Sequence, residues 1–384
     1  MIEKDNFFKN YFYNSSRYKK NLKQTKVAFK IFLEDIKNKK IPVLETYEKS
    51  YKYNFSPSAI KKFSKYKNII IIGMGGSILG TKSIYSFFKT KVKKKVFFFD
   101  NLDLNLKLKF NKIQNLKNSC FIVISKSGNT LETVTNLNII FSKSLFLNKL
   151  IIITEFKNNI LTKFANKFNA EIIEHRDFIG GRYSVMSEVG MLPASLMNLN
   201  IANFKSLKKL IRNKKFISSL IISVSSIYTL YQSGFKNSVI LNYDSSLNDL
   251  CLWHQQLTGE SLGKLGKGIT PIISQCPKDH HSLFQLYLDG PKDKFFTFFS
   301  SAEHNSFSKI VNAQCKATKN VFKKDKIPYR EFIFKKNAEN ELGSIFTFFV
   351  LETLLLAKLL RVNPFNQPGV EKIKIETKKI LGRR

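Results

Sequence analysis

Two short segments rich in glycine, serine and threonine have the composition of anion-binding loops. The first, Gly73-Met-Gly-Gly-Ser77, follows an apolar run, and its glycines would let backbone N–H groups approach a ligand closely. It departs from the dinucleotide pattern G-x-G-x-x-G at Ile78, and a structural turn remains the alternative. The second, Ser125-Lys-Ser-Gly-Asn-Thr130, adds three hydroxyl groups and a lysine at the expected start of a helix. A helix cap needs only one or two such residues, so this segment favours a phosphate cradle.

An arginine and a glutamate are candidates for the chemistry itself. Arg182 follows a pair of glycines and would offer an oxyanion a permanent charge with fixed donors, although a surface ion pair is an equal alternative. Glu260 lies among small residues just after a helix-like segment, where it could be a base or a solvated acid. The spacing from Gly259 to Gly263-Lys264 is one residue too short for a P-loop, which excludes an ATPase of that type.

Two adjacent histidines, His280 and His281, raise the question of a metal site. Adjacent residues point in different directions, and no H-E-x-x-H or carboxylate spacing completes a ligand set. Acid–base work is therefore favoured over metal binding, with a structural role as the alternative for each histidine, and no metal or cofactor is expected.

The elements that must position these residues have the rhythm of parallel βα units. From residue 68 onward, short apolar runs are each followed by a glycine or hydroxyl-rich turn and a helix-like stretch. We expect an α/β protein with an N-terminal helical segment at 1–60, a first α/β domain at 61–204 and a second at 205–384. The expected strands begin near Asn68, Val96, Cys120, Leu150, Ser238, Gly268 and Phe295, and an apolar helix covers 342–360.

Composition narrows the class of protein. The 384 residues carry a formal charge of +36, but the basic residues are scattered, so a solvated surface is favoured over specific binding of nucleic acid. The four cysteines are far apart, which fits a reducing compartment, and the polar start does not resemble a signal peptide. The uncharged stretch 216–235 contains too many polar residues for a membrane span. We therefore expect no membrane association and a cytoplasmic location.

Taken together and in this order, the segments resemble the glucose-6-phosphate isomerase family from about residue 68 to residue 375. The resemblance is carried by GMGGS, SKSGNTLET, GGRYSVMSEVG, GESLGKLGKGITP, HHSLFQLYLDGP and NPFNQPGVE. It implies two doubly wound parallel-sheet domains of the sugar isomerase (SIS) type, each a three-layer α/β/α arrangement. The family's usual NPFDQWGVE differs here at Asn366 and Pro368, which leaves the spacing from Gln367 to Lys374 unchanged.

The resemblance also implies roles for individual residues. Glu260 matches the base that carries a proton between C2 and C1 of the sugar, and Arg182 matches the arginine that stabilises the negative charge of the enediolate. His281 and Lys374 match the pair associated with opening the sugar ring, and the histidine is implied to come from the partner subunit of a homodimer. The residues that match substrate-binding positions are Gly76, Ser77, Ser125, Lys126, Ser127, Thr130, Gly181 and Gln367.

Three other functions remain as alternatives to an aldose–ketose isomerase of glycolysis and gluconeogenesis. A phosphosugar-binding protein without catalytic activity would need the loop from Ser125 to Thr130. It would not need Glu260, Arg182, His281 and Lys374 together. An isomerase that also accepts mannose 6-phosphate would differ by only a few pocket contacts. A nucleic-acid-binding role would rest on the net charge alone.

Overall fold

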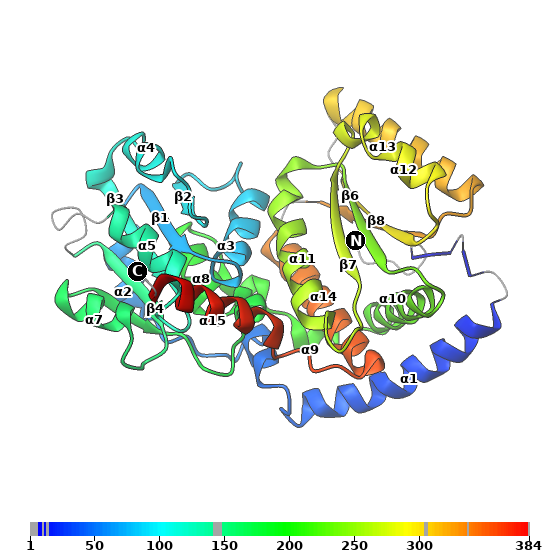
Figure 1. Ribbon diagram of the computed structural model, residues 1–384, viewed down its shortest axis with the longest axis horizontal. Coiled ribbons are helices and arrows are strands. Elements are labelled where there is room, and N and C mark those ends of the chain that lie inside the picture. The colour runs from blue at the N-terminus through cyan, green and yellow to red at the C-terminus, as the bar shows by residue number, and fades with distance from the viewer. Residues whose placement is uncertain are drawn as a thin grey trace.

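The computed structural model describes residues 7–9, 11–12, 15–140, 148–302, 306–335 and 338–382. The chain forms two parallel β-sheets that lie side by side, with α3 (Gly76–Phe87) and α11 (Asn248–Leu262) packed against each other between them (Figure 1). Helices cover both faces of each sheet. The expectation of an α/β protein with doubly wound parallel sheets is therefore confirmed, while the predicted domain boundaries at residues 60 and 204 remain predictions.

The first sheet has five strands in the order β2-β1-β3-β4-β5. Its central strands β1 and β3 are buried along their whole length, which explains their unbroken apolar runs. One face is covered by α4, α5 and α7, and the other faces the centre of the molecule. The strands are β1 (Asn68–Gly73), β2 (Lys95–Phe99), β3 (Ser119–Ile124), β4 (Leu150–Thr154) and β5 (Glu171–Glu174). The helices of this half are α2 (Pro57–Ser64), α4 (Leu106–Asn111), α5 (Leu131–Ile140), α7 (Ile160–Lys167), α8 (Glu188–Leu196) and the 3-10 turns η3 (Leu116–Asn118) and η4 (Gly181–Met186).

The second sheet has four strands in the order β7-β6-β8-β9. Its outer face packs against α12 and α13, and its inner face packs against α10, α11 and α14. The strands are β6 (Asn237–Asn242), β7 (Thr270–Gln275), β8 (Lys294–Ser301) and β9 (Tyr329–Phe334). The helices are α9 (Leu207–Leu210), α10 (Lys214–Gln232), α12 (Phe284–Asp289), α13 (Ser306–Lys324), α14 (Glu339–Leu360) and α15 (Pro368–Gly382), with the 3-10 turns η5 (Ile201–Phe204), η6 (Ser245–Leu247) and η7 (Lys278–His281).

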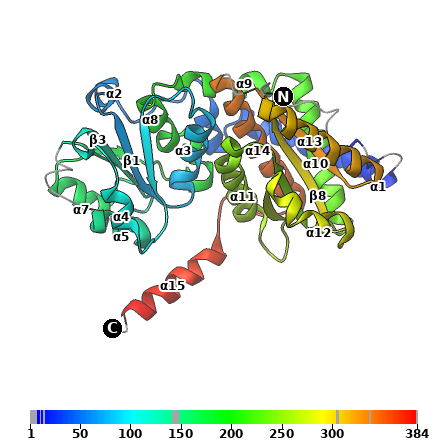
Figure 2. The same ribbon diagram turned by 90° about the horizontal axis from the view of Figure 1, so that it is seen from above.

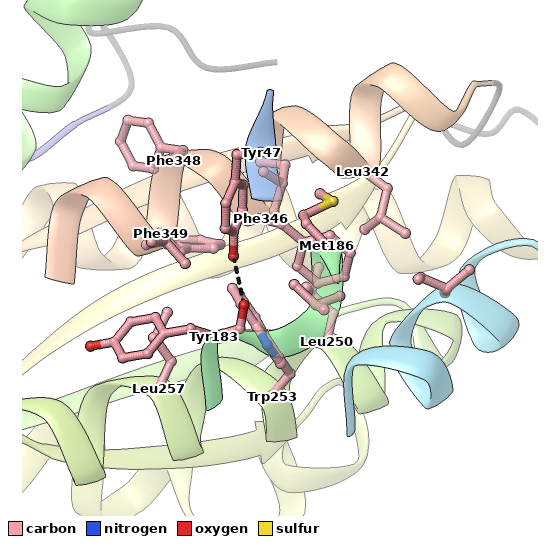
Figure 3. Packing of buried hydrophobic residues seen from close by; sticks show 14 of the residues in the cluster. Tyr47, Tyr183, Met186, Leu250, Trp253, Leu257, Leu342, Phe346, Phe348 and Phe349 are labelled. Atoms are coloured by element: carbon pink, nitrogen blue, oxygen red, sulfur yellow. Dashed lines mark hydrogen bonds between the residues drawn. The ribbon is translucent and has the colours of Figure 1, made fainter. Parts of the chain in front are cut away.

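One continuous hydrophobic core joins the inner faces of the two sheets. Trp253 of α11 is fully buried and packs edge-on against Phe346 of α14, with ring centroids 4.7 Å apart (Figure 3). From the first half, Tyr183 and Met186 of η4 reach the same cluster, where the hydroxyl of Tyr47 is 3.5 Å from the carbonyl oxygen of Tyr183. The relative position of the two sheets is therefore set by close apolar packing. The same packing fixes the positions of residues in any site between the sheets.

The N-terminal segment is helical, as expected, but it is divided between the two halves. Helix α1 (Ser16–Lys37) packs against α10 and α14, and α2 packs against α8. Between them, the 3-10 turn η2 (Pro42–Tyr47) contacts η4. The N-terminal segment therefore packs against both halves of the molecule.

One expectation from the sequence needs correction, and two strands were missed. Glu260 does not follow a helix but lies inside the last turn of α11, which ends at Leu262 because Gly263 caps it. Strand β9 was not predicted, because its sequence Tyr-Arg-Glu-Phe-Ile-Phe is interrupted by two charged residues. β5 was not delimited, because it has only four residues.

Helix α14 is the one helix, among the residues described, that is long and apolar enough to span a membrane. Most of it is buried inside the protein, where it contacts α10, α11 and η5. The stretch 216–235, which had the length of a span, lies largely in α10 and also packs into the central core.

Helix α15 contrasts with the rest of the molecule because none of its residues is buried. Figure 2 shows it projecting away from both sheets. Several apolar side chains along it are exposed to solvent: Val370, Ile373, Ile375, Ile380 and Leu381.

The packing of α14 yields a test of the central core. A Cβ atom added at Gly343 would lie 2.0 Å from the carbonyl oxygen of Phe204, which is backbone and cannot rotate away. Alanine normally favours a helix, but here the clash outweighs that gain, so Gly343→Ala should lower the free energy of unfolding by about 2 kcal/mol. The matched control is Gly382→Ala in α15, where no atom lies within 4 Å and thermal unfolding should be unchanged. Equal melting temperatures for the two variants would contradict the assigned contact.

Candidate active site

The two glycine- and hydroxyl-rich loops emerge at the same point of the first sheet. Strands β1 and β3 are neighbours, with Gly73 paired to Ile124 at their carboxyl ends. The chain leaves β1 toward β2 on one side and leaves β3 toward β4 on the other. Such a switch point opens a crevice outside the carboxyl ends of the strands, where ligands of open α/β sheets bind. Both predicted loops flank this crevice.

The first loop is held against the segment that carries Arg182. Gly75 has a φ of +52°, and a Cβ atom at Gly76 would lie 2.1 Å from the carbonyl carbon of Gly181. The Ser184 hydroxyl also donates to the Gly76 carbonyl oxygen over 3.1 Å. Only glycine at position 76 allows this approach, so the start of α3 and η4 form one surface. Ser77 lies half-buried in the first turn of α3.

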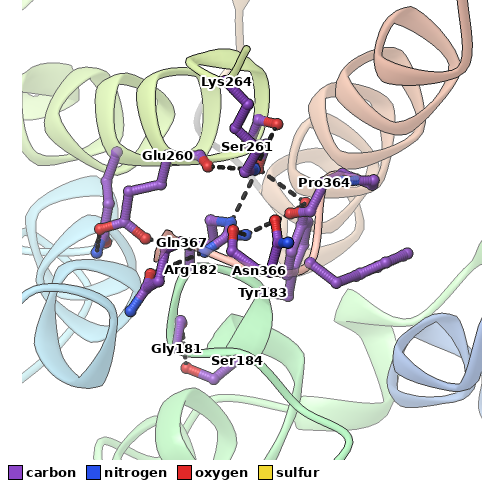
Figure 4. Close-up of polar contacts among 12 residues, drawn as sticks. Gly181, Arg182, Tyr183, Ser184, Glu260, Ser261, Lys264, Pro364, Asn366 and Gln367 are labelled. Atoms are coloured by element: carbon purple, nitrogen blue, oxygen red, sulfur yellow. Dashed lines mark hydrogen bonds and ion pairs between the residues drawn. The ribbon is translucent and has the colours of Figure 1, made fainter. Parts of the chain in front are cut away.

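The guanidinium of Arg182 is the most heavily bonded group of the site (Figure 4). Its side chain is 3% exposed, and Nε donates to the Ser261 hydroxyl over 2.9 Å. Nη1 donates to Oε2 of Glu260 and to Oε1 of Gln367, each over 3.0 Å. Nη2 donates to the carbonyl oxygens of Pro364 and of Asn366, the latter over 3.1 Å. All five donors of the guanidinium are thus used, so its position is fixed.

The carboxylate of Glu260 lies between two donors and stays partly open. Arg182 binds Oε2, and the amide of Gln256, one helical turn earlier in α11, donates to Oε1 over 2.8 Å. The side chain is 28% exposed, in contrast to that of the arginine. Its orientation is therefore defined by α11 and η4, while one side remains accessible.

A pocket of about 490 Å³ opens in front of this carboxylate. Its walls are the end of α11, the loop that follows it, and the segment from Asn363 to Val370. Lys264 reaches into the wall and donates to the carbonyl oxygens of Glu260 and Ser261 over 2.7 and 2.8 Å. Burial, followed by the nearby charge of Arg182, lowers the pKa of Lys264 to about 8. The pocket is therefore large enough for a sugar phosphate and lined by charged and amide groups.

The second loop, from Ser125 to Thr130, is held by a hydrogen bond within it and by contacts with neighbouring segments. The hydroxyls of Ser125 and Thr130 are 2.8 Å apart, and Gly128, with a φ of +65°, packs tightly against the side chain of Asn159. Lys126 donates to the carbonyl oxygen of Asp177 over 2.5 Å and lies 3.8 Å from Glu155. The lysine is thus engaged by protein groups, and the exposed Ser127 is the hydroxyl most open to solvent.

Of the predicted site residues, Glu260 and Gln367 line this pocket, whereas His281 and Lys374 lie on outer surfaces of the chain. His281 ends η7 with its side chain exposed, and its neighbour His280 bonds the hydroxyl of Tyr243 at 2.8 Å. Lys374 lies on the exposed helix α15, where it pairs with Glu371 at 2.8 Å. The chain therefore assembles Gly76, Gly181, Arg182, Glu260 and Gln367 around one point and leaves these two residues on outer surfaces.

Four contacts of the site were not predicted. Gln256 precedes Glu260 by four residues, a spacing that places both on one face of a helix and could have revealed it. Ser261 and Lys264 belong to the motif GESLGKLGKGITP, but the sequence pattern alone assigned no role to them. Tyr183 donates to the carbonyl oxygen of Pro364 over 3.0 Å, and burial raises the pKa of its hydroxyl.

The described residues contain no group of three or more histidine, cysteine, aspartate or glutamate side chains arranged to hold a metal ion. The four cysteines are free thiols, and burial raises the pKa of each.

Comparison with known proteins shows the family of this chain. The phosphoglucose isomerase family model matches residues 57–276. The chain is 32% identical to a glucose-6-phosphate isomerase of Methanocaldococcus jannaschii over 86% of this chain and 87% of that one. It is 29% identical to that of Mycoplasmoides gallisepticum over 95% and 97% of the two chains.

Two solved structures share the fold. A hypothetical protein of Thermus thermophilus superposes with a TM-score of 0.78 at 20% identity, covering 95% of this chain and 96% of that one. A glucose-6-phosphate isomerase of Chlamydia trachomatis superposes with a TM-score of 0.73 at 19% identity, covering 85% and 72%. On the family match and the identity to its relatives, this chain belongs to the phosphoglucose isomerase family.

Proposed function

We propose that this protein interconverts glucose 6-phosphate and fructose 6-phosphate, with Glu260 as the base that carries the proton. The observation that carries the proposal is the pairing of the buried Arg182 with Glu260, which lines a pocket of about 490 Å³. The aldose and the ketose differ by one proton and the position of a carbonyl. A single carboxylate can therefore remove the proton from C2 and return it to C1 of a cis-enediolate.

The pairing suits this chemistry because the arginine never lacks a negative partner. Before the reaction, Arg182 is balanced by the Glu260 carboxylate at 3.0 Å. When the proton moves to the carboxylate, that charge disappears and reappears on the oxygen of the enediolate. A guanidinium already fixed by backbone and side-chain acceptors needs no reorganisation to stabilise the new anion.

We assign the remaining substrate contacts to the two loops and to the segment after α14. Gly76, Ser77 and Gly181 would lie beside the sugar, and Gln367 would line the pocket. The phosphate would be bound by the loop from Ser125 to Thr130, where Lys126 would exchange the Asp177 carbonyl for the phosphate. Binding the remote phosphate would orient the reacting carbons.

Ring opening is assigned to His281 and Lys374, and this assignment requires a second copy of the chain. His281 is exposed on η7 and would enter the site of the partner in a homodimer. Lys374 belongs to α15, whose projecting position and exposed apolar side chains are explained if it packs against a partner subunit.

The cellular setting follows from the proposed reaction. It would place the protein in glycolysis and gluconeogenesis, and the free thiols support a reducing compartment such as the cytoplasm.

The base is tested with Glu260→Gln, which keeps the shape of the side chain and removes its basicity. We expect kcat for the conversion of fructose 6-phosphate to fall by about a thousand-fold while substrate affinity changes little. Turnover is followed by coupled oxidation of glucose 6-phosphate, and affinity by calorimetry. The control Glu45→Gln changes a partly exposed glutamate on η2 and should leave both values unchanged. Full activity in Glu260→Gln would remove this residue as the base, and an inactive wild-type protein would refute the isomerase.

The shared site is tested by mixing two inactive variants, Glu260→Gln and His281→Ala. A mixed dimer has one site with both intact residues if the histidine crosses the interface. Dissociation and reassociation of equal amounts should therefore restore about a quarter of the wild-type activity, since half of the dimers are mixed. No recovery, despite mixed dimers being detected by mass spectrometry, would place both residues in the site of one chain.

A further inference from the structure

The exposed histidine His281 belongs to a short element, η7, whose two preceding side chains are both engaged by the protein. Asp279 bonds to the end of β7, and His280 bonds to the hydroxyl of Tyr243, whereas His281 is exposed. In a 3-10 turn successive side chains are about 120° apart, so neighbours on one turn can face the protein and the solvent. The contacts of the first two residues therefore determine where His281 is presented.

The carboxylate of Asp279 fixes η7 to the end of β7. Its Oδ2 accepts hydrogen bonds from the backbone N–H of Gln275 over 2.7 Å and from the hydroxyl of Ser274 over 2.9 Å. Its Oδ1 accepts from the hydroxyl of Ser282 over 3.2 Å, on the other side of the two histidines in the sequence. This carboxylate therefore ties the residue after η7 to the strand that precedes it.

The imidazole of His280 makes a second anchor, to a different part of the fold. Its Nε2 lies 2.8 Å from the hydroxyl of Tyr243, which directly follows β6. That hydroxyl donates to Thr318 over 2.9 Å, and Thr318 donates to the carbonyl oxygen of Gln314 over 3.0 Å, both in α13. Each hydroxyl has only one proton, so the proton between His280 and Tyr243 must come from Nε2. The imidazole thus begins a chain of hydrogen bonds that ends on α13.

Aromatic packing holds the same imidazole. Its ring centroid lies 4.2 Å from that of Phe284 in α12 and 5.7 Å from that of Tyr243. Tyr243 in turn stacks on Phe298 of β8, with ring centroids 6.0 Å apart. These three aromatic residues belong to the outer core of the second sheet. His280 is therefore held by that core as well as by its hydrogen bond.

The electrostatics of the two histidines indicate separate roles. Burial, followed by the nearby charge of His281, lowers the pKa of His280, and the carboxylate of Asp279 opposes this shift. A neutral His280 can still donate from Nε2 to Tyr243. It therefore does not compete with its exposed neighbour for a proton that acid–base chemistry would use.

We propose that His280 is a positioning residue for His281, acting through Tyr243 to fix the direction in which η7 presents that imidazole to the partner subunit. The inference rests on the proposed function, in which His281 takes part in opening the sugar ring. His280 itself would not touch the substrate. A histidine with a purely structural role would stabilise its own chain, and its effect on activity would not depend on His281.

This dependence is tested with a double-mutant cycle on the whole protein. His280→Leu removes the donor, and kcat for fructose 6-phosphate should fall by at least about ten-fold because His281 is no longer aligned. Tyr243→Phe keeps the stacked ring, removes only the hydroxyl and should cause a loss of the same kind. In the His281→Ala background, either change should alter kcat by less than about two-fold.

Two further variants separate the hydrogen bond from other effects. His280→Gln supplies an amide that can donate to the same hydroxyl, so it should restore most of the activity. Lys278→Gln changes an exposed residue of η7 and should leave kcat unchanged.

Several results would overturn the inference. Equal losses in the two backgrounds would make His280 independent of His281, and full activity of His281→Ala would leave nothing to position. Equal activity of the Leu and Gln variants at position 280 would exclude the hydrogen bond as the cause. An inactive wild-type protein would instead refute the isomerase on which the inference rests.

A second measurement asks in which site the defect lies. In a mixed dimer of His280→Leu and Glu260→Gln chains, the site with an intact Glu260 receives His281 from a chain with an intact His280. Dissociation and reassociation of equal amounts should therefore raise the activity from about a twentieth to about a quarter of the wild-type value. Unchanged activity, with mixed dimers detected by mass spectrometry, would place the effect of His280 within its own chain and overturn the inference.

Discussion

The candidate active site depends on a single buried cation whose hydrogen-bond donors are all in use. Arg182 belongs to the first half of the chain, and every group to which its guanidinium donates a hydrogen bond belongs to the second half. A guanidinium buried to this extent is stable only if its charge is compensated and its donors are satisfied. The carboxylate, the glutamine and the two backbone carbonyls are therefore held in place by the same requirement that keeps the arginine in the interior.

This constraint links the fold to the chemistry. The apolar core between the sheets fixes α11 relative to η4, and the close contact of Gly76 with Gly181 leaves no room for η4 to move toward α3. Glu260 and Arg182 then differ in one respect that matters for a proton transfer: the carboxylate is partly open and the guanidinium is closed off. The group that must reach the substrate is accessible, and the group that must stabilise charge is rigid.

Much of the architecture could be predicted because buried parallel strands leave a clear signal. The runs at β1, β3 and β4 are continuously apolar, whereas β9 carries Arg330, which is buried through bonds to Thr297, Ser223 and Glu352 that no local pattern reveals. The positions of most site residues followed from a resemblance of motifs rather than from their spacing. What could not be predicted was tertiary: the contacts of Arg182 with the carbonyls of Pro364 and Asn366, and the projection of α15.

The distribution of the arginine's partners along the chain also bears on how the protein is made. Synthesis delivers the first sheet and Arg182 long before the segment at Pro364 and Gln367, which follows Arg182 by more than 180 residues. Domains tend to fold as they emerge from the ribosome, so the first half would be compact while its central cation still faced water. Burial of that charge becomes favourable only when the segment from Pro364 to Gln367 is available. The active site would thus be completed as one of the last events of folding, and truncated chains would lack it even with both sheets intact.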